Sequence, residues 1–400
     1  MKKTMAAAGL LVAFSIASFF AISQTLQLPP GFAATIVAEG LGPTRHIAIT
    51  KQGNIYVKLA RLKDGKGILY LKQSKEGRFT QQLAFADYPG TGIFIKGDYL
   101  YASSNSEVFR YQLDKNGDVV NAAKPERIIT GLVDRNRDNS KSIAVDNNNH
   151  IYVNAGSYIN SCLVDPQSRK APNPCPLLDS VGGIWQFAAN KQNQQYKDAV
   201  HYATGLKNVV GLDWNTQTSS LFVMQHGRGD LDALYPALYT KEQGSFLPAE
   251  TMYEVKKGTD GGWPYVYYDQ YQHKKMLAPE YGGDGKKAAT HKAVDPIAVF
   301  PAHLGPNALL FYTGNKFPAK YKNGAFIAFH GKSPELQKGY LVAFVPFKNG
   351  RPSGKWEIFA DNFLINKDQH KPCGLAQAPD GSVYICDDFS GSIYRIQYGK

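Results

Sequence analysis

Cysteine is scarce in this sequence, and its spacing excludes several classes of protein. Only four cysteines occur in 400 residues, and no two of them form a Cys-x-x-Cys pair. The common zinc motifs and the Cys-x-x-Cys-His attachment site of c-type haem are therefore absent. The cysteines form two local pairs, Cys162 with Cys175 and Cys373 with Cys386, and in an oxidising compartment an even number indicates disulfides. A Pro-Asp-Gly turn between Cys373 and Cys386 favours bridging across adjacent strands, but the sequence leaves the bonding of both pairs open.

Long apolar runs are also absent beyond residue 22, and helical periodicity is nearly absent. The early apolar run, residues 5–22, follows two lysines and ends in small residues. That order is typical of a secretory signal peptide, so we expect residues 1–23 to be removed and residues 24–400 to form one soluble domain. The protein is then periplasmic or secreted, with no stable membrane insertion. An uncleaved anchor helix is the alternative.

No cluster of Lys or Arg accompanies the formal net charge of +12. Scattered positive charge on an exported chain argues against nucleic acid as a partner. A mean hydropathy of −0.33 and 12% aromatic residues are typical of a folded chain with a substantial core. The positive charge therefore favours an anionic small ligand or an acidic envelope surface.

What the sequence does contain is a repeated strand–turn–strand unit. Short apolar or alternating runs bounded by Gly, Asn, Asp or Pro are typical of strands. Six such units begin at His46, Gly92, Ser142, Val210, Ala308 and Cys373. Radial repetition of this kind predicts an all-β fold, a six-bladed β-propeller, with a large β-sandwich as the alternative. The only helix expected after the signal peptide is a short one over residues 232–240.

Polar or cationic residues precede the six inner strands of these units. In a propeller the inner strands line the axis, so the residues just before them gather at one mouth. These residues are Arg45 and His46, Thr91, Ser140 and Lys141, Lys207 and Asn208, His303, and Lys371. Cations and histidines around one mouth suit an anionic, oxygen-rich ligand.

A glycine-rich segment with two carboxylates, residues 225–232, follows the fourth unit. Calcium binds carboxylate and backbone carbonyl oxygens, and a glycine-rich turn can direct several carbonyls to one point. The metal site is therefore predicted at Gly227, Arg228, Asp230 and Asp232. Asp and Gly are also ordinary turn formers, so a simple turn is the alternative.

These motifs resemble the soluble quinoprotein glucose and sorbosone dehydrogenases. Residues 205–212 resemble the family's Gly-x-Arg-Asn-x-x-Gly-Leu segment, residues 225–232 resemble its calcium-and-quinone loop, and residues 262–265 resemble its Gly-Trp-Pro motif. The likeness covers nearly the whole mature chain. It implies a propeller that binds pyrroloquinoline quinone (PQQ) and calcium and oxidises a sugar hydroxyl by hydride transfer to the quinone, with a separate electron acceptor.

The resemblance also assigns the cofactor site residue by residue. The cofactor-binding positions that it implies are Lys141, Lys207, Asn208, His226 and Lys371. At Lys141, Lys207 and Lys371 the chain has lysine where the family has arginine. Lysine cannot hold a planar carboxylate with two parallel hydrogen bonds, so these replacements weaken the implied activity.

The family's catalytic histidine is replaced in this chain by Asp138. A buried carboxylate with a raised pKa can act as a base, whereas nearby cations lower that pKa. Asp138 and His303 are therefore the predicted catalytic residues, and His46 is a further alternative because histidine titrates near neutral pH.

Three functions stay open on the sequence. The first is an exported PQQ- and calcium-dependent sugar dehydrogenase. The second is a non-catalytic propeller that binds an anionic sugar or another small ligand. The third is a calcium-dependent lactonase-type hydrolase, which needs several carboxylates or asparagines around one axial metal, whereas the loops at this mouth are cationic.

Overall fold

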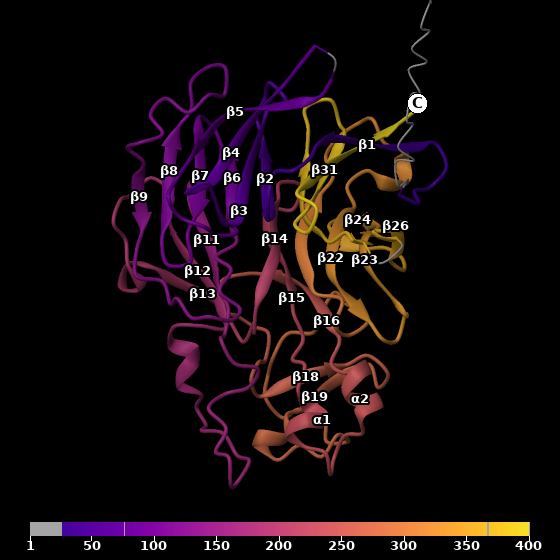
Figure 1. Ribbon diagram of the computed structural model, residues 1–400. Helices are drawn as coiled ribbons and strands as arrows, with labels where there is room; N and C mark the ends of the chain where they lie inside the picture. Colours follow the sequence, from indigo (N-terminus) through magenta and orange to yellow (C-terminus); the bar gives the residue numbers. More distant parts are fainter. Residues whose placement is uncertain (1–25, 76, 366–367, 400) are drawn as a thin grey trace, which may run out of the picture.

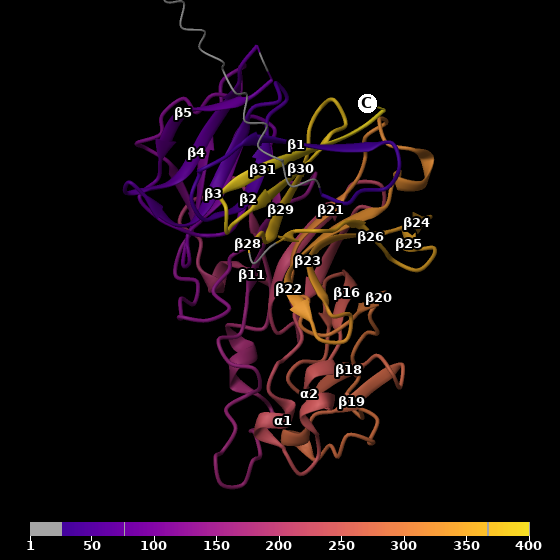
Figure 2. The same cartoon turned by 45° about the vertical axis from the view of Figure 1, so that its right-hand side comes forward.

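The computed structural model describes residues 26–75, 77–365 and 368–399, so the expected signal peptide lies outside the described residues. The described residues form six sheets of four or five strands around one axis, as Figures 1 and 2 show. This arrangement confirms the predicted all-β, six-bladed propeller. No helix in the described part of the chain is long and apolar enough to cross a membrane.

Each blade is built on four antiparallel strands, the first of which lies at the axis. Blade one contains β2 (Thr44–Ile49), β3 (Ile55–Lys63), β4 (Lys66–Gln73) and β5 (Phe79–Phe85). Blade two contains β6 (Ile93–Lys96), β7 (Tyr99–Ser103), β8 (Val108–Gln112) and β9 (Glu126–Ile129). Blade three contains β10 (Ile143–Val145), β11 (His150–Ala155), β12 (Gly183–Ala188) and β13 (Val200–Thr204), with β17 (Thr259–Asp260) added in parallel.

The remaining three blades follow the same order. Blade four contains β14 (Val209–Asn215), β15 (Ser220–Gln225), β16 (Glu250–Val255) and β20 (Ala298–Phe300). Blade five contains β21 (Pro306–Phe311), β22 (Ala325–Ser333), β23 (Lys338–Val345) and β26 (Glu357–Ala360). Blade six contains β29 (Pro372–Gln377), β30 (Val383–Asp387), β31 (Ser392–Tyr398) and β1 (Phe32–Ala38).

The ring is closed by pairing between the two ends of the described chain. Strand β1 pairs antiparallel with β31, with Phe32 opposite Tyr398. The Phe32 ring packs edge-on against Phe317 and Phe359 of blade five. Burial of such rings stabilises the fold by roughly 2–3 kcal/mol each, so the closure also fastens blade six to blade five. The sequence analysis did not identify β1.

Side segments complete the described chain. Four are turns or two-stranded ribbons on the blades: β24 (Phe347–Lys348) with β25 (Arg351–Pro352), β27 (Leu364–Ile365) with β28 (Asp368–Gln369), and the 3-10 turns η2 (Tyr196–Asp198) and η4 (Ala319–Tyr321). The others belong to a lobe beside blades three and four, which we define as residues 156–182, 226–249 and 261–297. It contains α1 (Leu231–Leu234), α2 (Lys241–Phe246), β18 (Val266–Asp269), β19 (Lys274–Leu277), η1 (Pro176–Asp179) and η3 (Pro279–Tyr281) (Figure 1).

The helix expected over residues 232–240 is wrong in its bounds. Helix α1 ends at Leu234, and α2 begins only at Lys241. The Thr240 hydroxyl accepts a hydrogen bond from the Gln243 backbone, and the Gln243 side chain accepts one from the Thr240 backbone. Such a capping box starts a helix, so the chain forms two short helices in place of one.

Candidate functional site

The residues that precede the inner strands form a polar cluster at one end of the axis. The ammonium of Lys207, two residues before β14, lies 2.7 Å from a carboxylate oxygen of Asp138, which precedes β10. The Asn208 amide donates to the other Asp138 oxygen at 3.3 Å. Lys207 is almost fully buried, with 5% of its side chain exposed, whereas 19% of the Asp138 side chain is exposed. The structure therefore brings together three of the predicted site residues.

Close packing of the backbone fixes the position of Asp138. Its φ of 48° lies in the left-handed region, which aspartate enters more readily than most residues. Directly opposite is Gly156, where an added Cβ would lie 2.3 Å from the Asn208 side-chain oxygen and 2.5 Å from the Asp138 carbonyl oxygen. Only glycine permits this approach, so the arrangement of Asp138 and Asn208 depends on Gly156.

Lys141 is a second buried cation at this mouth. The whole residue is 1% exposed. Its ammonium donates hydrogen bonds to the backbone carbonyl of Asn139 at 3.1 Å and to the Asn139 side-chain oxygen at 3.0 Å. Within the described residues it forms no ion pair. Burial lowers the pKa of Lys141 to about 8, although the charge of Asp134 acts in the opposite direction. Lys141 thus supplies positive charge that no described carboxylate neutralises by contact.

Two histidines near the axis are held by backbone carbonyls. The Nε2 of His226 lies 3.0 Å from the carbonyl oxygen of Pro306, and the Nε2 of His46 lies 2.8 Å from that of Asn307. A carbonyl only accepts, so both rings carry their hydrogen on Nε2. Burial, followed by the positive charge of Lys207, lowers the pKa of His226 to about 4. Burial, followed by Arg45, lowers the pKa of His46 to about 4, so both rings are neutral at physiological pH.

A third histidine, His330 on β22, pairs with a carboxylate at the same mouth. Its Nε2 lies 2.8 and 2.9 Å from the two oxygens of Asp388, which also forms an ion pair with Arg45 at 3.3 Å. Burial opposes ionisation of Asp388, but the hydrogen bond and charge of His330, with the charge of Arg45, outweigh it and lower the Asp388 pKa. The Nδ1 of His330 has no hydrogen-bond partner among the described residues. The sequence analysis missed both His330 and Asp388.

Lys371 lies beside this pair on the backbone. Its carbonyl accepts a hydrogen bond from the Asp388 backbone at 3.2 Å. Its ammonium lies over the rings of Tyr340 and Phe389, 5.6 and 5.8 Å from their centroids, and forms no ion pair with a described residue. The mouth therefore carries Lys141 and Lys371 as cations free of a carboxylate contact.

Glu250 connects the glycine-rich segment to blade five. One of its carboxylate oxygens accepts a hydrogen bond from the Gly227 backbone at 2.8 Å, and the other accepts one from Gly305 at 3.2 Å. Burial raises the pKa of Glu250 to about 7, although these hydrogen bonds act in the opposite direction.

His303, a predicted catalytic residue, points towards the lobe, where its Nε2 lies 3.0 Å from the carbonyl oxygen of Gly244 in α2.

The carboxylates of the predicted metal segment are not gathered around one point. Arg228 bonds to Asp230 at 2.7 Å and to Glu280 of η3 at 2.7 and 3.0 Å, so these three residues form a buried ion-pair network. Asp232 packs against Gly244, where an added Cβ would lie 2.2 Å from its oxygen. No three His, Cys, Asp or Glu side chains in the described chain are placed to hold one metal.

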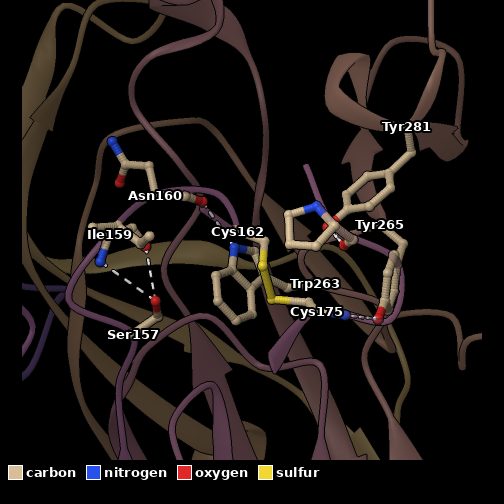
Figure 3. The surroundings of a disulfide bond; sticks show 9 residues. Ser157, Ile159, Asn160, Cys162, Cys175, Trp263, Tyr265 and Tyr281 are labelled. Carbon is tan, nitrogen blue, oxygen red and sulfur yellow. Dashed lines mark hydrogen bonds between the residues drawn. A yellow bond between two sulfur atoms is a disulfide. The ribbon is translucent and has the colours of Figure 1, made fainter. Parts of the chain in front are cut away.

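The lobe is fastened beside this segment by a disulfide and a tryptophan. Cys162 and Cys175 are bonded, whereas Cys373 and Cys386 are not. Figure 3 shows the Trp263 ring beside the Cys162–Cys175 bond, with its indole nitrogen donating to the Asn160 carbonyl at 2.8 Å. Trp263 also lines a cavity of about 20 Å³ together with His226, Gly227 and Pro248. It therefore both fills the lobe core and forms a wall of this small cavity.

Comparison with known proteins identifies the family of this chain. The model of the TrAA12-like family matches residues 26–399. The chain belongs to the TrAA12-like family. A curated relative, the pyrroloquinoline quinone-dependent sugar dehydrogenase of Hypocrea jecorina, is 22% identical over 92% of this chain and 88% of the relative. The fold is that of the holo PQQ domain of pyranose dehydrogenase from Coprinopsis cinerea (TM-score 0.75, 19% identity, 94% and 97% of the two chains covered). It is also that of a calcium structure of the Trichoderma reesei AA12 enzyme (TM-score 0.76, 17% identity, 94% and 97% covered).

The mouth of this TrAA12-like chain thus combines predicted and unforeseen residues. The predicted residues that it brings together are Asp138, Lys141, Lys207, Asn208, His226 and Lys371. His303 lies apart from them, against α2. The pair His330–Asp388 comes from strand β22 and the turn after β30, neither of which precedes an inner strand. A search restricted to residues before inner strands could not find it.

Proposed function

We propose that this TrAA12-like protein is an exported sugar dehydrogenase that uses PQQ with calcium and passes the electrons to a separate acceptor. The observation that carries the proposal is the pair of cations without carboxylate contacts, Lys141 and Lys371, at a mouth that also holds Lys207 and Arg45. Lys141 is buried and Lys371 is half-buried, and a buried ammonium without a paired anion is costly unless a ligand supplies the anion. The relative from Hypocrea jecorina is named a pyrroloquinoline quinone-dependent sugar dehydrogenase, which supports PQQ as that anion.

The donor set of the mouth fits such a cofactor. When bound, PQQ supplies a two-electron acceptor whose carboxylates are complementary to these cations. Lys141, Lys207 and Lys371 would hold its carboxylates as point charges, and the amide of Asn208 adds a hydrogen-bond donor beside them. The rings of His226 and His46, both neutral and with fixed tautomers, would line the floor of the site without adding charge.

The calcium ion is proposed in the small cavity beside the glycine-rich segment. Gly227 and Pro248 both line this cavity, and no described residue donates a hydrogen bond to their carbonyl oxygens. A volume of about 20 Å³ is enough for one water molecule or ion. Backbone carbonyls are ligands that calcium prefers. In this proposal the metal therefore depends on carbonyl oxygens of Gly227 and its neighbours, while Asp230 stays bound to Arg228.

His330 is the residue we propose as proton acceptor for the sugar hydroxyl. Its Nε2 hydrogen is held by Asp388, so its Nδ1 keeps a lone pair directed away from that carboxylate, and Asp388 would stabilise the ring once it is protonated. Asp138 already accepts from Lys207 and Asn208, which makes it a positioning residue for Lys207. His303, bonded to α2, takes no part.

Dye reduction on a panel of aldoses and alditols tests the proposal. The purified protein is treated with a chelator, reloaded with PQQ and calcium, and compared with samples that lack one of the two. We expect turnover only with both, and on at least one sugar. Binding of PQQ without turnover on any sugar would favour a non-catalytic propeller, and turnover without PQQ would contradict the proposed cofactor.

A further inference from the structure

A pair of buried thiols lies directly behind the mouth in blade six. Cys373 on β29 and Cys386 on β30 are both fully buried, and their sulfur atoms are 3.4 Å apart. Gly374 is opposite Cys386 in the ladder, and a β-bulge follows Pro372. In a regular ladder neighbouring residues point to opposite faces, so the bulge is what brings Cys373 to the same face as Cys386.

The two sulfur atoms occupy space beside Gly374 that a larger residue at that position would fill. A Cβ added to Gly374 would lie 2.7 Å from the Cys386 sulfur and 2.4 Å from the Arg45 carbonyl oxygen. Any side chain at this position would therefore displace the sulfur or the backbone of Arg45. The pair occupies a built pocket between β29, β30 and the start of β2.

The backbone at these thiols is also the backbone that carries the mouth. The Arg45 carbonyl accepts from the Cys373 sulfur at 3.2 Å and from the Cys386 sulfur at 2.8 Å. Cys386 is two residues before Asp388, and the side chains of Arg45 and Asp388 form the ion pair beside His330. A small movement of the two sulfurs therefore moves the main chain on both sides of that ion pair.

We propose that Cys373 and Cys386 close to a disulfide when the chain folds in an oxidising medium, and that this bond sets the positions of Arg45 and Asp388 at the mouth. Closure forms one S–S bond and releases two protons and two electrons from the two thiols. An external disulfide, either a small molecule or a thiol–disulfide oxidoreductase, takes up both and is reduced to two thiols by exchange. The bonded pair Cys162–Cys175 requires an oxidant of the same class.

The bond state is fixed at folding. Burial, followed by the neighbouring Cys386, raises the pKa of the Cys373 thiol well above its ordinary value. The thiolate is the species that attacks a disulfide, so the folded dithiol form is nearly unreactive. The two cysteines are 13 residues apart, so the unfolded hairpin can close before the core forms around it.

Refolding under two redox conditions tests whether the bond forms. Reduced, denatured protein is refolded either with a glutathione redox couple or with excess reductant, then denatured and alkylated for peptide mass mapping. With the redox couple we expect no alkylation of Cys373 or Cys386, and a cross-linked peptide lighter by two hydrogen atoms. A Cys162→Ser/Cys175→Ser variant should give the same result, which excludes exchange between the pairs. Full alkylation of Cys373 and Cys386 in material whose Cys162–Cys175 bond has closed would overturn the proposal.

A histidine titration tests the second half of the proposal without any cofactor. The imidazole NMR signal of His330, assigned with a His330→Gln variant, is followed against pH in the bridged protein and in a Cys373→Ser/Cys386→Ser variant. Because Asp388 is bonded to this ring and paired with Arg45, we expect the two curves to differ. Superimposable curves would show that the bond leaves the mouth unchanged. Both readouts are independent of PQQ, so they stand whether or not the proposed function holds.

Discussion

The Lys207 ammonium and the Asp138 carboxylate are 2.7 Å apart at the mouth of the propeller, and the Asn208 amide occupies the second carboxylate oxygen. This contact bears on the role of Asp138, which stands where the quinoprotein dehydrogenases have their histidine. Both carboxylate oxygens of Asp138 therefore already accept hydrogen bonds from side chains of the protein itself. In the proposed function Asp138 therefore positions Lys207, and another group accepts the substrate proton.

Substitution of His330 should separate these roles. We expect His330→Gln to lower kcat/KM by about 10²–10⁴-fold, the contribution of a general base, with PQQ still bound. Asp138→Asn should cost less than about tenfold in kcat and should act mainly on PQQ affinity. His150→Gln is the matched control, because His150, the first residue of β11, forms a similar 2.8 Å pair with Asp146 in the preceding turn. An equal loss of kcat in Asp138→Asn and His330→Gln would contradict this assignment.

The low pKa of Lys141 makes anion binding dependent on pH. Burial lowers this pKa to about 8, so the ammonium loses its proton as the pH rises past that value. We expect PQQ affinity to fall above about pH 8 in the wild type, and to be weaker but flatter in Lys141→Gln. Lys51→Gln, an exposed lysine in the turn before β3, should behave as the wild type. Fluorescence titrations across the pH range measure this. A wild-type affinity that is constant up to about pH 10 would rule out the role of Lys141.

The Arg228–Glu280 pair should dominate the stability of the lobe. The two side chains are 4% and 0% exposed, so removal of one leaves a buried, uncompensated charge. We expect Arg228→Met to lower the free energy of unfolding by about 3–5 kcal/mol, as measured by urea denaturation. Arg127→Met, which breaks the half-exposed pair with Glu107, should cost less than about 1 kcal/mol. Equal costs for the two variants would refute the argument.

Sequence reasoning recovered the parts of this protein that repeat. Each inner strand has an apolar run before a polar turn, so six blades and the lysines before them were predictable. The closing strand β1 was not, because its partner β31 lies at the other end of the chain and its pattern does not repeat. The ion-pair network of Arg228 could not be predicted either, because Glu280 lies 52 residues away from it in the sequence. The His330–Asp388 pair could not be predicted for the same reason, because the two residues are 58 positions apart in the sequence.

Asp213 should give the wild type a pH-dependent stability. This carboxyl on β14 faces the central channel, of about 360 Å³, and burial raises its pKa to about 7 against a hydrogen bond from Phe311. The unfolded side chain ionises near pH 4, so stability should fall between about pH 4 and about pH 7 and then level off. Asp213→Asn stays neutral in both states and should lack this loss, which is on the order of 2 kcal/mol because the group is partly open to the channel. Urea denaturation midpoints of the wild type and of Asp213→Asn at about pH 5 and about pH 8 measure this loss of stability. Parallel pH profiles of the two proteins would contradict the role of Asp213.

The proposed function requires that this chain bind PQQ through its lysines and a calcium ion. The decisive measurement is a titration of the chelator-treated protein with PQQ, with and without calcium, followed by quinone absorbance and repeated on a Lys141→Gln/Lys371→Gln variant. The expected result is saturable binding that requires calcium and is weakened at least about tenfold in the variant. Absence of binding, or binding indifferent to both calcium and the two lysines, would show that the mouth of this propeller serves another ligand.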